Sequence, residues 1–268
     1  YLSENYSRTV SAGFGFEAEF LNPRKVMYLH HDALDMDYKS VNTLGTFAYL
    51  HYDNLNKKSF PTRGVAGKID FKWKDLVFSS NNMNSLSYGS LVFGFEGYVP
   101  IIENRLVMIP QFYGSFLFGK GSVNGTTNSW NPIFNGPVPA YPAMNTVIGG
   151  AEMGRYIDQQ IPFIGVNKIS LAFNNAAVAR LDIRTRLFKK HDLTAIVNYA
   201  RSSIDFKDFF KQRNELAWGD MYNYNASNWW GAGLRYSINT KLGPINLDIS
   251  SSSISKKVNL YLSVGYYF

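Results

Sequence analysis

The chain has 268 residues, of which 46% are hydrophobic and 18% charged, and its formal net charge is +7 at pH 7. No uninterrupted apolar run approaches the roughly 18 to 20 residues of a membrane-spanning helix, so the sequence excludes a helical membrane protein. Cysteine is absent, which excludes disulfides and thiolate metal sites.

A mean hydropathy of −0.18 is nevertheless compatible with a protein that crosses a membrane with strands. Each such strand needs only about 10 residues and alternates lipid-facing with lumen-facing side chains, so the average stays near zero. The 20 Phe, 18 Tyr, 5 Trp and 22 Gly are typical of these strands and of interfacial aromatic girdles. The basic charge alone would also suit nucleic acid, but cations equally line a water-filled lumen or meet lipid phosphates.

Strict alternation of apolar and polar residues begins near the N-terminus. Phe14, Phe16 and Phe20 share one face of an expected strand, and Glu17 and Glu19 share the other. Ten segments alternate well and are the expected strands: 9–21, 44–53, 64–78, 87–99, 105–120, 176–188, 193–204, 228–240, 245–251 and 258–268. Their apolar faces are rich in aromatic residues, which lipid accepts in any shape, whereas a soluble core has to interdigitate closely.

The strand 176–188 places Arg180, Asp182, Arg184 and Arg186 on one face. In a soluble barrel this charged face would point out to water, and in a membrane barrel it would point into the lumen. Alternation alone does not choose between the two, but the aromatic apolar faces favour the membrane. The fold class that we expect is therefore all-β.

More specifically, we expect a closed antiparallel transmembrane β-barrel of about 12 strands, with roughly 10 to 16 allowed, because bacterial single-chain barrels have an even number. Residues 25–38 and the segment before Asn174 are the candidates for the further strands. Two long connections, 121–175 and 205–227, are rich in loop residues, and long loops of this kind are usually functional. Residues 1–268 are expected to form a single domain.

Two stretches carry a resemblance to a known family. The first is the Asp-Asn-Leu-Asn turn that starts at Asp53, followed by Phe-Pro-Thr-Arg-Gly at residues 60–64. The second is the finish, with a strand that closes at Gly243, a next strand from Ile245, and a last strand that ends at Tyr266 and Phe268. Together they resemble the BamA-type outer-membrane barrel superfamily, also called the bacterial surface antigen family, over essentially the whole chain. The terminal Phe268 is similar to the signal by which such barrels are recognised for assembly.

The resemblance implies a long loop, here about 121–175, that folds into the lumen and presents an arginine motif. The corresponding residues are Gly149, Gly150, Gly154, Arg155 and Tyr156, although the order Gly-Arg-Tyr departs from the family's Arg-Gly-Phe or Arg-Gly-Tyr. It further implies that Arg155 contacts the inner wall, with Asp182 as its partner, since a buried cation needs a carboxylate or carbonyl. Asn198 stands where the family has an aspartate. The alternative for Arg155 is a solvated loop cation. For Arg180, Arg184 and Arg186, a solvated lumen wall is the favoured interpretation.

Residues 149–165 look most like the membrane domain of patatin-like outer-membrane proteins, which resemble a lipid hydrolase fused to a C-terminal barrel. The hydrolase would need a Gly-x-Ser-x-Gly elbow and an Asp-Gly partner, and the chain contains neither. The start at Tyr1, without Met or a signal segment, leads us to expect the C-terminal part of a longer protein. We therefore expect no catalytic residues and no enzyme activity in this chain.

The histidines do not change this expectation. His51 and His191 are scattered. His30-His31 beside Asp32 and Asp35 could bind a metal, although adjacent strand residues point to opposite faces. We therefore favour the interpretation that these histidines lie at the barrel rim or on the surface. There is no phosphate-cradling glycine loop, so we expect no metal and no cofactor.

The leading hypothesis is an integral outer-membrane barrel that serves as membrane anchor or translocation domain for an N-terminal patatin-like partner. The expected contacts are outer-membrane lipid including lipopolysaccharide, the barrel assembly machinery during biogenesis, the N-terminal domain, and other subunits or a second copy, but not nucleic acid. An outer-membrane assembly or translocation factor and a passive porin are the alternatives. A barrel-embedded lipase is disfavoured because no triad is visible.

Overall fold

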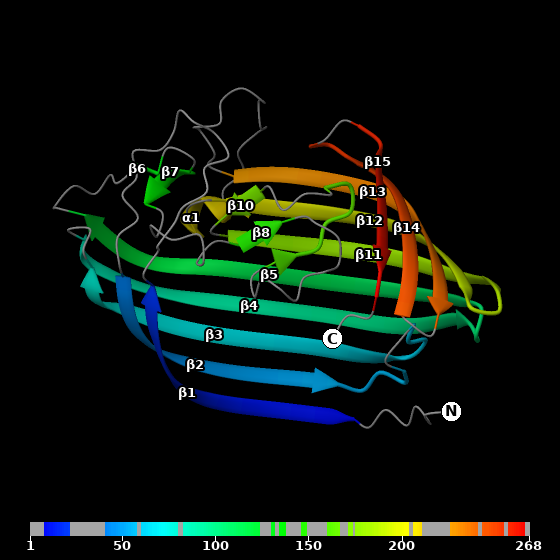
Figure 1. Ribbon diagram of the computed structural model, residues 1–268, viewed down its shortest axis with the longest axis horizontal. Helices are drawn as coiled ribbons and strands as arrows, with labels where there is room; N and C mark the ends of the chain where they lie inside the picture. Colours follow the sequence, from blue (N-terminus) through cyan, green and yellow to red (C-terminus); the bar gives the residue numbers. More distant parts are fainter. Residues whose placement is uncertain are drawn as a thin grey trace.

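The computed structural model describes residues 8–21, 41–57, 60–79, 83–123, 130–131, 134–137, 146–148, 160–166, 171–173, 175–203, 206–210, 226–240, 243–254 and 257–265. Its main feature is a ten-stranded antiparallel sheet with the order β1-β2-β3-β4-β5-β11-β12-β13-β14-β15 (Figure 1). The strands are β1 (Thr9–Leu21), β2 (Val41–Asp53), β3 (Gly64–Ser79), β4 (Met83–Ile102), β5 (Leu106–Val123), β11 (Asn175–Phe188), β12 (His191–Ser203), β13 (Ala226–Thr240), β14 (Gly243–Ser252) and β15 (Asn259–Val264). All ten expected segments are therefore strands of one sheet.

The residues between β5 and β11 contribute five short strands. These are β6 (Trp130–Asn131), β7 (Phe134–Pro137), β8 (Thr146–Ile148), β9 (Gln160–Ile161) and β10 (Leu171–Phe173). β10, β8 and β9 form a separate three-stranded sheet, so the segment before Asn174 adds no strand to the main sheet within the described part of the chain. Residues 25–38 lie outside the described residues, so the count of twelve stays a prediction.

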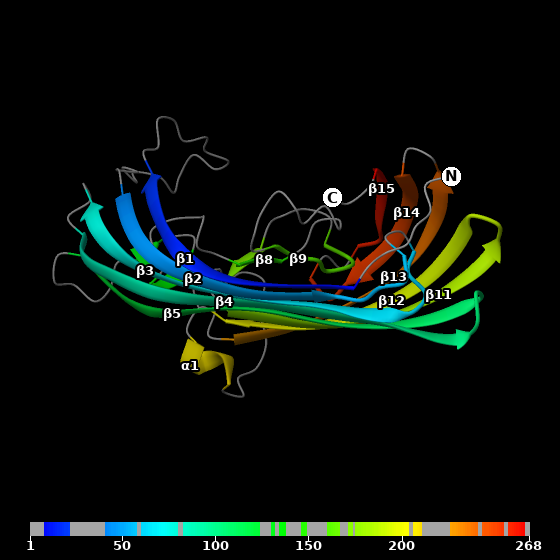
Figure 2. The ribbon, with the colours of Figure 1, turned by 90° about the horizontal axis from the view of Figure 1, so that it is seen from below.

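The sheet bends into a trough, with β8 and β9 on the concave side and the short helix α1 (Phe206–Phe209) on the convex side (Figure 2). The expected closure into a barrel is not present in the described residues, where β1 pairs with β2 alone and β15 with β14 alone. Closure would require a matched ladder between the two edges. Here β1 has 13 residues, β15 has 6, and β15 runs steeply across the direction of β1 (Figure 1).

The two faces of the sheet have opposite chemistry. Phe14 and Phe16 are 85% and 83% exposed, and Leu260 is 67% exposed, all on the apolar face of their strands. The alternate positions bury polar groups, among them Asp248 at 3% and Ser237 at 1% exposure. A monomeric soluble protein rarely exposes apolar surface in such continuity. Polar side chains thus line the inside of the trough, and large apolar side chains cover the outside.

Glycines make room for aromatic rings on both faces. A Cβ at Gly114 on β5 would lie 2.3 Å from the ring of Phe93 on β4, and a Cβ at Gly15 on β1 would lie 2.7 Å from the ring of Phe47 on β2. In each pair the ring therefore covers the backbone of the glycine directly opposite on the neighbouring strand. This arrangement is a known way to pin strand register, and it accounts for the joint abundance of Phe, Tyr and Gly.

The connection between β2 and β3 is held by its asparagines. The Asn54 side-chain oxygen accepts from the Val65 amide at 2.6 Å, and the Asn56 oxygen accepts from the Thr62 amide at 2.9 Å. Gly64 has a φ of +118°, and a Cβ there would lie 2.5 Å from the Asn54 carbonyl oxygen. Only glycine fits such a position without strain. The Asp-Asn and Phe-Pro-Thr-Arg-Gly pattern thus encodes one compact turn.

Among the described residues, no helix has the length and the hydropathy to cross a membrane.

Candidate functional site

The concave face carries a network of buried charges in which β11 is central. Arg180, Asp182 and Arg184 alternate along β11 and are only 4%, 5% and 8% exposed. They are therefore not a solvated wall, because a charge buried to this extent needs a partner. Each is held by a defined contact.

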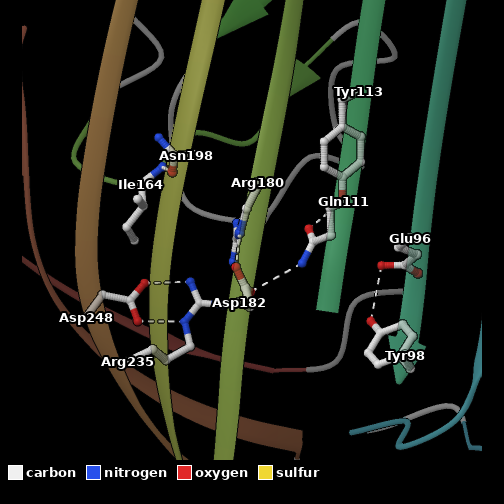
Figure 3. Close-up of polar contacts among 10 residues, drawn as sticks. All are labelled: Glu96, Tyr98, Gln111, Tyr113, Ile164, Arg180, Asp182, Asn198, Arg235 and Asp248. Carbon is white, nitrogen blue, oxygen red and sulfur yellow. Dashed lines mark hydrogen bonds and ion pairs between the residues drawn. The ribbon is translucent and has the colours of Figure 1, made fainter. Parts of the chain in front are cut away.

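Arg180 and Asp182 form a bidentate ion pair on the same strand. The Arg180 Nε donates to Asp182 Oδ1 and its Nη2 to Oδ2, both at 2.7 Å (Figure 3). Gln111 of β5 donates to the same Oδ2 at 3.2 Å, and Tyr113 donates to Gln111 at 2.8 Å. Both oxygens of Asp182 are thus engaged, and the chain of contacts ties β11 to β5.

A second pair, which the sequence did not single out, joins β13 to β14. Arg235 donates from Nε and Nη2 to the two oxygens of Asp248, each at 2.7 Å (Figure 3). The two residues are direct partners in the strand register. Both residues occupy polar positions in strands whose residues alternate between apolar and polar. Pairing these two strands in sequence order would therefore have revealed the contact.

A third group of charges lies between β1 and β3, across β2. Lys74 approaches Glu19 Oε2 at 2.6 Å, and Lys72 approaches Glu17 at 3.7 Å. Gly45 of β2 lies between these strands, and a Cβ there would lie 2.9 Å from Lys74 Cγ. The missing side chain therefore lets the lysine reach across the middle strand.

Arg184 reaches the turn between β2 and β3. Its Nη2 donates to the Pro61 carbonyl, and its guanidinium lies 5.6 Å from the Phe60 ring centroid and 5.9 Å from that of Tyr98. Pro61 is buried, as is Thr62 at 9% exposure. The turn is thus attached to a strand more than a hundred residues later, at the end of the trough where the short connections lie.

Residues 160–166 lie against the concave face and bury apolar groups there. Ile161, Phe163 and Val166 form a small cluster with inward residues of the sheet, and Phe163 meets Trp229 edge-on at 6.5 Å. The Ile164 amide donates to Asn198 Oδ1 at 2.9 Å (Figure 3), and the Gly165 carbonyl accepts from Ser252 and Asn259, both at 3.0 Å. Asn198 Nδ2 is buried with no partner among the described residues.

Several residues singled out from the sequence lie outside the described part of the chain: Gly149, Gly150, Gly154, Arg155, Tyr156, Tyr266 and Phe268. The contact between Arg155 and Asp182 therefore stays a prediction. Of the expected wall residues, Arg180 and Asp182 contact each other, Arg184 contacts a turn, and Asn198 contacts the 160–166 segment. Within the described residues, no group of three or more His, Asp or Glu is arranged to hold a metal.

Comparison with known proteins assigns this architecture to a family. The family model described as "OMP85 superfamily" matches residues 1–130 and 134–268 of this chain. The solved structure of BamA from Haemophilus ducreyi lacking POTRA domains 1–3 is similar, with a TM-score of 0.57 and 17% identity over 96% of this chain. The chain spans about half of that structure, 51% of its length, and the likeness at this identity concerns the fold. No curated protein matches.

We predict that removal of one partner from the Arg235 and Asp248 pair is costly, whereas replacement of both is tolerated. Arg235→Met alone leaves the buried Asp248 carboxylate uncompensated and should lower the free energy of unfolding by about 3–5 kcal/mol. The double variant Arg235→Met and Asp248→Leu should recover most of this loss. Denaturant unfolding of the lipid-reconstituted protein measures both, and equal losses in the single and double variants would contradict the prediction.

We also predict that Arg184 keeps the β2–β3 turn closed. Arg184→Ala should raise the initial rate of trypsin cleavage after Arg63 at least about tenfold, since a hydrogen bond to a charged group contributes roughly 1.5–3 kcal/mol. Mass spectrometry of the early fragments gives the rate. Arg186→Ala is the matched control, because Arg186 lies on the same strand but pairs with Asp192 at 3.3 Å. Similar cleavage in the two variants would rule out this role.

Proposed function

This chain belongs to the OMP85 superfamily, and we propose that it is the membrane-embedded anchor or translocation domain of a longer outer-membrane protein. The observation that carries the proposal is the inverted distribution of side chains, with apolar residues outside and paired charges inside. Each strand from β2 to β14 in the main sheet pairs with a neighbouring strand on both sides, the arrangement that satisfies backbone polar groups in hydrocarbon. An integral position in the bacterial outer membrane follows from this distribution together with the family.

We propose that the residues around Arg155 form a loop inside the trough. The motif lies between β8 and β9, and the 160–166 segment that follows it packs on the concave face. The buried and unpartnered Asn198 Nδ2 suits a carbonyl from residues outside the described ranges. Asp182 already accepts from Arg180 and Gln111, so Arg155 would join this network instead of forming an isolated pair. A filled interior favours an anchor over a passive porin.

An N-terminal patatin-like hydrolase is the partner that we propose. Support comes from the resemblance of residues 149–165 to patatin-like proteins, and the chain itself carries no elbow motif for hydrolysis. The alternative partner is a set of periplasmic modules, as in an assembly factor, which the structural likeness to BamA favours. In both cases the Tyr266 and Phe268 terminus would serve as the assembly signal read by the barrel assembly machinery. Outer-membrane lipid, lipopolysaccharide and a second copy of the chain remain proposed contacts.

The residues encoded upstream of Tyr1 distinguish the two partners. A Gly-x-Ser-x-Gly elbow followed by an Asp-Gly pair would support the hydrolase fusion, and phospholipid hydrolysis by the full-length protein should then disappear when the elbow serine becomes alanine. Repeated periplasmic modules in its place would support the assembly factor. Large and steady single-channel conductance of the reconstituted chain would contradict both and support a porin.

The membrane position itself predicts a strong effect of charge on the convex face. Val197 lies at the middle of β12 and is 52% exposed on that face. Val197→Arg should lower the free energy of unfolding in lipid vesicles by about 2–4 kcal/mol, the usual cost of arginine at the bilayer midplane. Val197→Ile is the control and should be close to neutral. If the two variants are equally stable, this face does not meet hydrocarbon.

A further inference from the structure

The described residues that follow β12, 206–210, lie on the apolar face of the sheet. The short helix α1 is on the convex side, opposite to β8 and β9 (Figure 2). The long connections, including the one that contains α1, are all at one end of the strands. A connection that served only to bridge two strands would be expected to lie in water above the rim.

Aromatic rings attach α1 to the sheet. Phe209 is 8% exposed and meets Phe116 of β5 edge-on at 5.0 Å, and Phe206 meets Phe116 at 5.9 Å in the same geometry. Edge-to-face contacts at these distances are favourable for aromatic pairs. Phe116 also stacks on Phe93 at 6.0 Å, so α1 extends a continuous layer of rings on the convex face.

Arg201 secures the end of the helix. Its Nε donates to the Phe209 carbonyl, and its guanidinium lies 5.7 Å from the centroid of the Phe209 ring. A second nitrogen donates to Asn228 at 3.1 Å. A helix leaves its last carbonyls without partners, which is costly where water is scarce. The arginine therefore satisfies a backbone group at a position next to apolar surface.

Two aromatic residues at α1, Phe206 within it and Phe210 directly after it, are exposed. Phe210 is 70% exposed and packs edge-on against Phe206 and Phe209, each at 5.3 Å, while Phe206 is 38% exposed. Ring contacts through Phe116 and Phe93 connect Phe206 to Phe112, which is 46% exposed on the strands. An aromatic group beside a charged one at the end of membrane strands is the composition of the lipid–water boundary.

We propose that α1 is a lipid contact, with Phe206 and Phe210 inserted at the boundary between the acyl chains and the headgroups. Because the longer connections of such barrels lie outside the cell, the contact is with the outer leaflet. This inference rests on the proposed membrane position of the sheet.

Spin labels test the inference, and the absence of cysteine makes each single label unique. Phe210→Cys is labelled with a nitroxide in phosphatidylethanolamine–phosphatidylglycerol vesicles, and its collision rates with oxygen and with a neutral nickel chelate are measured. Val197→Cys is the reference for lipid, and Glu103→Cys, with a side chain 78% exposed at a short turn, is the reference for water. The oxygen-to-nickel ratio at Phe210 should exceed that at Glu103 about tenfold, since polar solutes are excluded from hydrocarbon.

The outcomes separate the two claims. A water-like ratio at Phe210 beside a lipid-like ratio at Val197 would overturn the lipid contact alone, and low collision with both reagents would overturn it in favour of coverage by protein. A water-like ratio at Val197 would overturn the membrane position and the lipid contact together. Should Phe210→Cys fail to fold, a label at Phe206→Cys gives the same comparison from the other exposed ring.

Discussion

The structure depends on one constraint: a strand alternates its side chains between two faces, and here the two faces meet different surroundings. Because each strand inside the sheet pairs with a neighbour on both sides, the chain can present hydrocarbon-compatible residues outward while its backbone groups bond to adjacent strands. The register keeps the two faces distinct, since a shift by one residue would move the outward phenylalanines inward and the charges of the concave face outward. The glycine and aromatic pairs hold that register in place.

The same alternation forces the charges together on the concave face. Two bidentate ion pairs result, Arg180 with Asp182 and Arg235 with Asp248. Arginine supports this geometry with its planar guanidinium, and lysine does not. The Arg235 and Asp248 pair connects two neighbouring strands, whereas the Arg180 and Asp182 pair lies within one strand.

The connections are as informative as the strands. The turn after β2 folds inward and is held by Arg184, the 160–166 segment fills the concave face beside Asn198, and α1 folds outward onto Phe116. Each connection is positioned by a side chain that lies on a distant strand. In each case the contact satisfies a backbone carbonyl or amide, or buries an aromatic ring, which a loop in water would not require.

The sequence by itself determined the strands and their faces, because a period of two is a local property that each segment displays alone. It also identified the family through the Asp53 and Phe60 turn, whose asparagines and glycine act within a few residues of one another. The tertiary structure decided which charges pair, as Arg235 and Asp248 meet only after two strands align. It likewise decided that Arg184 reaches Pro61 and that Phe209 lies outside the sheet. The last two contacts join residues far apart in the chain, so no local pattern encodes them.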